Sequence, residues 1–166
     1  MMLFKPYHIN WKHFLLFMMW LLIYSSAQAQ VKPPSPMLVS NSQSLNFGYF
    51  TQYDDMGGTL TFSSTGVRSS TGNISTIGFS GYYAIFTVTA APGTQIVLLN
   101  GPAFTLTGSN GGSMTLHLTS AYPACPYTTT TTSTQIQIGG TLTIGSRAAN
   151  PPGNYSGTFA VTFNNE

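Results

Sequence analysis

Apolar and polar residues alternate along most of the chain from Leu45 onward. Successive side chains of an extended strand point to opposite faces, so an alternation of period two predicts strands with one buried face. No stretch has the 3.6-residue spacing that predicts an amphipathic helix. The alternating runs are separated by Gly, Pro and Asn, and the clearest are LNFGYF, GTLTFS, YAIFTVTA, FTLTG, SMTLHLTS and TQIQIGGTLTIGS.

The number and spacing of these runs favour an antiparallel β-sandwich or β-barrel. Of these we expect an all-β, immunoglobulin-like (Greek-key) sandwich of about eight or nine strands. Gly139-Gly140 interrupts one run, and predicts either a tight hairpin or a bulge within one long strand.

The most regular alternation lies at the end of the sequence, where Tyr155, Gly157, Phe159, Val161 and Phe163 fall on one face. This pattern predicts a last strand over 155–163 that lies inside the sheet and closes the domain. The alternative is that subunits exchange strands by β-augmentation. Residues 30–44 offer only MLVS behind three prolines, which differs from an alternating strand-donating extension.

The first residues have the order of a secretory signal peptide. Lys5 and Lys12 precede an apolar run over 14–24, and Ala27-Gln28-Ala29 is a small-x-small cleavage site that leaves Gln30 first. The apolar run is shorter than the roughly 20 residues of a membrane-spanning helix. We therefore predict a signal peptide over 1–29, a Pro-rich extended leader over 30–43 and a β-sandwich domain over 44–166. The expected location is outside the cytoplasm of a bacterium, in the periplasm, at the cell surface or beyond it, with no stable membrane span after cleavage.

Charge is scarce after the predicted cleavage site. Three cations (Lys32, Arg68 and Arg147) balance three anions (Asp54, Asp55 and Glu166), so the formal net charge is zero. A field this weak cannot attract a polyanion, which argues against nucleic acid as a partner. Near-zero charge also offers little protection against association, which suits a protein packed against itself or other envelope proteins.

The groups that could perform chemistry are few and scattered. Asp54-Asp55 precede Gly57-Gly58, which predicts a solvated turn, with a single-site calcium turn as the alternative. His117 lies between Leu116 and Leu118, so we expect its side chain on the solvent face of a strand. Cys125, the one cysteine, is expected to be a half-buried small residue, or else to form an intermolecular disulfide. We predict no catalytic residue, cofactor or metal site, and a protein that is not an enzyme.

Several segments taken in order resemble the bacterial family called domain of unknown function 4402. The similarity covers about residues 44–164, and its most specific parts are Asn46-Phe47-Gly48 and the stretch PGNYSGT at 152–158. The resemblance implies an exported, fimbria-like β-sandwich whose ending is similar to spore coat protein U-type and pilin domains. It implies no catalytic residues.

These observations lead us to expect a secreted or cell-surface structural or adhesive protein, fimbria-like and non-enzymatic. The alternative is an extracellular module that binds a glycan or a small ligand through aromatic residues near loops. The candidates for such a site are Tyr82, Tyr83, Tyr122 and Tyr127.

Overall fold

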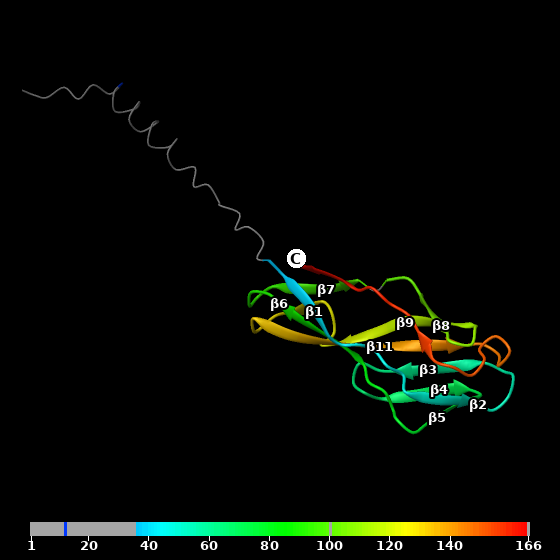
Figure 1. Ribbon diagram of the computed structural model, residues 1–166. Coiled ribbons are helices and arrows are strands. Elements are labelled where there is room, and N and C mark those ends of the chain that lie inside the picture. Colours follow the sequence, from blue (N-terminus) through cyan, green and yellow to red (C-terminus); the bar gives the residue numbers. More distant parts are fainter. Residues whose placement is uncertain (1–11, 13–35, 100, 166) are drawn as a thin grey trace, which may run out of the picture. The chain divides into compact units, whose positions relative to one another are not determined.

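The computed structural model describes residues 12, 36–99 and 101–165, and the predicted cleavage residues Ala27, Ala29 and Gln30 lie outside them. Among the described residues, no helix is long and apolar enough to cross a membrane. The described part of the chain forms thirteen strands (Figure 1). They are β1 (Leu38–Gln43), β2 (Tyr49–Gln52), β3 (Gly58–Phe62), β4 (Arg68–Gly72), β5 (Ile74–Ile77), β6 (Ala84–Thr89), β7 (Gln95–Leu99), β8 (Phe104–Gly108), β9 (Ser113–Tyr122), β10 (Tyr127–Thr128), β11 (Ser133–Ile144), β12 (Tyr155–Ser156) and β13 (Thr162–Asn165).

The strands pair antiparallel, so the predicted all-β antiparallel class is confirmed. The largest sheet has the order β1-β6-β11-β9-β8-β12, and β3 and β4 extend it from β11. The others are β10-β7-β13 and β2-β5. There are more strands than the eight or nine predicted because short ones form where alternation is weak. β4 and β5, for example, lie in the Ser- and Gly-rich connection after β3.

The centre of the large sheet is β11, which changes partner halfway along its length. Its first part pairs with β6 as far as Ile138, and its second part pairs with β3 from Gly140 onward. The register against β9 shifts at the same point, so Gly139-Gly140 is a bulge and not a hairpin. Other backbone approaches closely here, since a Cβ atom on Gly139 would lie 2.3 Å from the Phe62 carbonyl oxygen. Glycine is therefore required at Gly139 for packing.

The folded unit begins earlier than the predicted boundary at residue 44. β1 falls inside the predicted leader of 30–43, yet it pairs with β6 from Leu38↔Thr89 to Gln43↔Ile85. Its residues are exposed apart from half-buried Gln43, so no alternating apolar pattern marks the strand in the sequence. Backbone pairing holds β1 in place instead.

The prediction of one continuous last strand over 155–163, placed inside the sheet, is wrong. β12 pairs with β8 in the large sheet, whereas β13 pairs with β7 at an edge of the three-stranded sheet. The residues between them cross from one sheet to the other (Figure 1). The alternation still marks the inward side, because Phe159 packs against both hydrophobic clusters of the domain.

The two clusters define two halves of the domain. In the sandwich half, β6 and the first part of β11 are packed with β7 and β13 around one cluster: Ala84, Phe86, Val88, Ile96, Ile136 and Ile138. β1 pairs with β6 beside this cluster, and β10 pairs with β7. In the barrel half, the second part of β11 lies between β3-β4 and β9-β8-β12. The chain then passes from β4 through Asn73 into β5, which pairs with β2 in a separate two-stranded sheet. The interior cluster of the barrel half is Phe47, Leu60, Phe62, Ile74, Met114, Leu116, Leu142 and Ile144.

Candidate functional site

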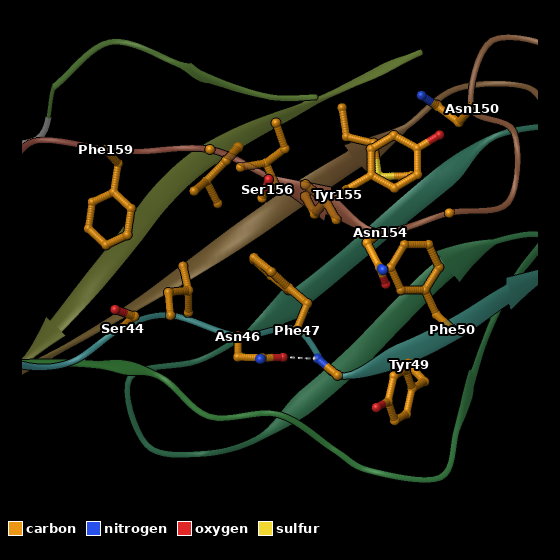
Figure 2. A pocket seen from close by; sticks show the side chains of 18 of the residues that line it. Ser44, Asn46, Phe47, Tyr49, Phe50, Asn150, Asn154, Tyr155, Ser156 and Phe159 are labelled. Carbon is orange, nitrogen blue, oxygen red and sulfur yellow. Dashed lines mark hydrogen bonds between the residues drawn. The ribbon is translucent and has the colours of Figure 1, made fainter. Parts of the chain in front are cut away.

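A cleft of about 860 Å³ lies in the barrel half, and we call it the seam cleft. One wall is residues 44–52, including β2, and the other is residues 150–159, including β12. Figure 2 shows Phe47 and Phe159 extending from opposite walls into the space between them. The floor belongs to the interior of the sheet: Phe86, Leu106, Met114, Leu116 and Leu142.

The cleft exists because two strand edges face each other without pairing. Among the described residues, β2 pairs with β5 alone and β12 pairs with β8 alone. The Tyr53 amide donates to the Asn73 carbonyl at 3.1 Å, which continues the β2–β5 ladder on the odd-numbered residues of β2. Antiparallel ladders alternate, so the backbone groups of Phe50 and Gln52 point away from β5. The backbone groups of Phe50 are thus directed into the cleft, whereas the Gln52 carbonyl on the same edge accepts a hydrogen bond from Arg147.

The wall of residues 44–52 is fixed by its backbone. Asn46 and Tyr82 exchange two backbone hydrogen bonds of 2.8 Å each, and the Asn46 side chain accepts from the Gly48 amide at 2.7 Å. Gly48 has a φ of +69°, and a Cβ atom there would lie 2.1 Å from the Phe79 carbonyl oxygen. These contacts give the motif Asn46-Phe47-Gly48 a physical role, because they hold Phe47 in the cleft wall.

The opposite wall begins at buried Asn150. Its side-chain amide donates to the Ser113 carbonyl at 2.6 Å, and its side-chain oxygen accepts from the Gly145 amide. Tyr155 donates its hydroxyl to the Pro151 carbonyl at 2.7 Å, and its ring packs against the barrel-half cluster. The turn that precedes β12 is therefore hydrogen-bonded, through Asn150, to Ser113 at the start of β9.

Arg147 lies at one end of the cleft and is the one charged residue that lines it. Its guanidinium donates to the Gln52 carbonyl at 2.6 Å, while the Gln52 side chain donates to the Gly145 carbonyl at 2.6 Å. Sequence reasoning found neither Asn150 nor Arg147 as site residues. An Asn directly before Pro151-Pro152 was the available signal, since such residues often fix turns.

A second feature is an exposed aromatic cluster on the outside of β2. The ring centroids of Tyr49 and Phe79 are 6.4 Å apart, and those of Phe79 and Tyr82 are 5.7 Å apart. Arg68 supports the cluster by donating to the Tyr49 carbonyl at 2.5 Å and to the Phe79 carbonyl at 3.4 Å. Burial lowers the pKa of the Arg68 guanidinium, and its Nε atom is buried without a partner.

The structure does not gather the four predicted tyrosines into one site. Tyr82 belongs to the exposed cluster, whereas half-buried Tyr83 packs against Phe62 at 6.4 Å. Tyr122 is exposed at the end of β9, and Tyr127 is half-buried in β10. No ring contact among the described residues joins one of these tyrosines to another.

The remaining candidates stand in separate places. Asp54 accepts hydrogen bonds from the Met56 amide and the Asn73 side chain, as expected of a turn residue. His117 is exposed on β9, as predicted. Cys125 is half-buried, as predicted, and burial raises the pKa of its thiol. Among the residues that the structure describes, no three His, Cys, Asp or Glu side chains are grouped so that they could hold a metal ion.

Comparison with known proteins places the described domain in a family. A family model described as "domain of unknown function (DUF4402)" matches residues 37–164, which include β1 and most of β13. Neither a curated protein nor a solved structure matches the chain. The match covers well over half of the chain, so the protein belongs to the DUF4402 family.

Proposed function

We propose that this protein is an exported, non-enzymatic structural or adhesive component of the bacterial envelope, fimbria-like in its role. The observation that carries the proposal is the outer edge of β1, whose backbone groups are not paired with another described strand. Among the described residues, β1 pairs with β6 alone, and its sequence LVSNSQ has no charge and no proline. Monomeric proteins protect such edges with lysines, prolines or covering segments. An open neutral edge suits a protein that pairs with neighbours.

The faces of the sheets support the same role. Hydroxyl groups pair across neighbouring strands, as in Thr59–Thr71 at 2.6 Å and Ser42–Thr87 at 2.7 Å. These side chains are polar but uncharged, and charged residues make up only 5% of the chain. Such a surface suits close packing against other neutral proteins outside the cell.

The proposal is tested by deleting the gene and comparing cell fractions and electron micrographs of the cell surface. We expect the protein outside the cytoplasm, and altered surface structure or adhesion in its absence. Purified protein should associate as its concentration rises, and Val39→Lys in β1 should weaken this association. Thr105→Lys, on an exposed position of β8, is the matched control. A monomer at every concentration together with an unchanged cell surface would contradict the proposal.

A second candidate function is glycan binding, favoured by the exposed cluster of Tyr49, Phe79 and Tyr82. Flat aromatic faces stack on sugar rings, and the exposed fractions here are 64%, 48% and 40%. Saturable binding on a glycan array that Tyr82→Ala abolishes and Tyr122→Ala preserves would support this function. Equal loss in both variants would argue against a site at the cluster.

A further inference from the structure

We infer that the seam cleft binds one extended polypeptide strand, supplied by another protein chain, that is neutral along its length and carries apolar side chains at alternate positions. This inference rests on the proposed function as an assembling envelope protein. It concerns a different surface from the β1 edge, and names the chemistry of the partner.

The first argument is the order of the strands around the barrel half. From β11 the paired strands run through β3 to β4 in one direction and through β9 and β8 to β12 in the other. Beyond β4 the chain passes through Asn73 into β5, which pairs with β2. The two directions end on either side of the seam cleft (Figure 2). A barrel removes its free edges by closing. Here β4 and β5 are joined through the chain and not by strand pairing, and the edges of β2 and β12 face each other across the cleft without pairing. One added strand would supply the missing partner.

The second argument is the chemistry of the two edges and the floor. The outward backbone groups of Phe50 require hydrogen-bond partners, which a strand laid along β2 would provide. Every second side chain of that strand would face the floor, where Leu106 is half-buried and covers the buried Leu116 and Leu142. The intervening side chains would face solvent, because strand side chains alternate. The wall of residues 44–52 has room for a segment of about five to eight residues at about 3.3 Å per residue.

The third argument is charge. Arg147 is the one charged side chain among the residues that line the cleft, and it lies at the end next to Gln52. A charge placed over the apolar floor would be costly unless paired, so the middle of the bound strand should be neutral. A carboxylate is acceptable at the end beside Arg147, where the remaining guanidinium donors can contact it.

The N-terminal segment of a second copy does not have this chemistry. Residues 38–43 already pair with β6, and their apolar residues Leu38 and Val39 are adjacent in sequence and so point to opposite faces. The residues before them include Pro33, Pro34 and Pro36, which have no backbone N–H to donate to either edge. We therefore assign the bound strand to another protein rather than to this N-terminal segment of a second copy.

The direct test uses synthetic peptides of about eight residues, the longest segment for which the wall has room, with the purified protein. In the probe, Val and Leu alternate with Thr and Asn, and in the control the same residues are regrouped so that the apolar ones are adjacent. We expect the alternating peptide to bind at least about ten-fold more tightly. Equal binding of both peptides would overturn the inference, and so would tighter binding of a peptide copying residues 36–44 of this chain, which would make a second copy the occupant.

N-methylated probes test insertion between two edges without changing the protein. Methyl groups on the odd-numbered residues of the peptide block one of its edges, and methyl groups on the even-numbered residues block the other. A strand inserted between β2 and β12 loses affinity with either set. Loss with one set alone would show addition to a single edge, which contradicts insertion.

A pair of protein variants locates the site. Phe50→Ser alters the cleft wall, and Phe163→Ser alters an equally half-buried phenylalanine outside the cleft. We expect about a ten-fold loss of peptide affinity in the first variant and little change in the second, with circular dichroism to confirm that both are folded. Equal affinities would contradict the site. Peptide binding and the cell-surface phenotype are separate readouts, so a failed peptide test with an intact phenotype rejects this inference and leaves the proposed function standing.

Discussion

The two halves of the domain use the same alternation of apolar residues but differ in how they are closed. In the sandwich half, β13 covers the core by pairing with β7, and Ile96, Ile136 and Ile138 are fully buried. In the barrel half, the cluster that contains Leu60 and Leu142 is equally buried, but β2 and β12 face each other across a cleft whose lining residues Phe50, Leu106 and Tyr155 are half-buried. Alternation thus decides which side chains point inward. It does not decide whether every strand edge finds a partner.

The segment between β12 and β13 accounts for the difference. Phe159 lies against Phe86 at 6.3 Å and against Phe104 at 6.0 Å, so it anchors the chain where it leaves one sheet for the other. Because the segment crosses between sheets here, it completes the sandwich half and leaves β12 with two residues of pairing. This crossing therefore supplies β13 to the sandwich half and leaves the edge of β12 in the barrel half unpaired beside the cleft.

The largest expected effect separates the two cores directly. Ile136→Ala in the sandwich half should lower the free energy of unfolding by about 2–5 kcal/mol, because it leaves a cavity in a fully closed core. Phe50→Ala in the barrel half should cost less, since this side chain is half-buried at the edge of an existing cleft. Urea unfolding of the two variants measures the difference. An equal loss of unfolding free energy in the two variants would argue that the barrel half is closed in solution.

The next effect concerns the anchor of the cleft wall. Asn150→Ala leaves the Gly145 amide and the Ser113 carbonyl without their partner, and should cost about 1–3 kcal/mol. Asn164→Ala, at an exposed position of β13, should stay within about 0.5 kcal/mol of the parent. Denaturant midpoints measure both, and similar values for the two variants would remove Asn150 from its anchoring role.

A smaller effect is expected at a turn of the sandwich half. Buried Thr129 donates its hydroxyl to the Ala91 carbonyl at 2.8 Å and accepts from the Thr94 amide at 3.1 Å. Thr129→Val should destabilise by about 1–2 kcal/mol, whereas exposed Thr130→Val should change little. Thermal unfolding compares them. A neutral Thr129→Val would show that this turn does not depend on the hydroxyl.

The smallest effect concerns the reactivity of the Cys125 thiol. Burial raises the pKa of the Cys125 thiol, so its thiolate is scarcer in the folded chain than in the unfolded chain, whose thiol pKa is about 8.5. Iodoacetamide should react more slowly with folded protein than with urea-unfolded protein near that pH. The unfolded state gains more from ionisation, so this group should lower stability as pH rises through the alkaline range. Equal alkylation rates would contradict the assigned burial.

Much of the fold was predictable because alternation reports which face of a strand is buried. Ile136, Ile138, Leu142 and Ile144 point inward as their spacing requires, and His117 points outward. The pairing of β1, the break after Ser156 and the partner change at Gly139 were not predicted. Each depends on backbone contacts between residues far apart in sequence, which local alternation does not encode.

The candidate site was predictable in part for the same reason. The two most specific motifs of the family resemblance, Asn46-Phe47-Gly48 and residues 152–158, fall on opposite walls of the seam cleft. Their sequences indicated special backbone geometry but not that they face each other. Arg147 and Asn150 join the site through contacts with Gln52 and Ser113, which the order of residues does not reveal.

Amide hydrogen exchange of the purified protein tests the open seam most directly. The amides of β11, which has a partner strand on each side, should exchange slowest. The amides of Phe50 and of residues 157–159 should exchange within the earliest time points, and the alternating peptide should slow them. Protection of Phe50 equal to that of β11 in the protein alone would show that the seam is closed, and would contradict this account.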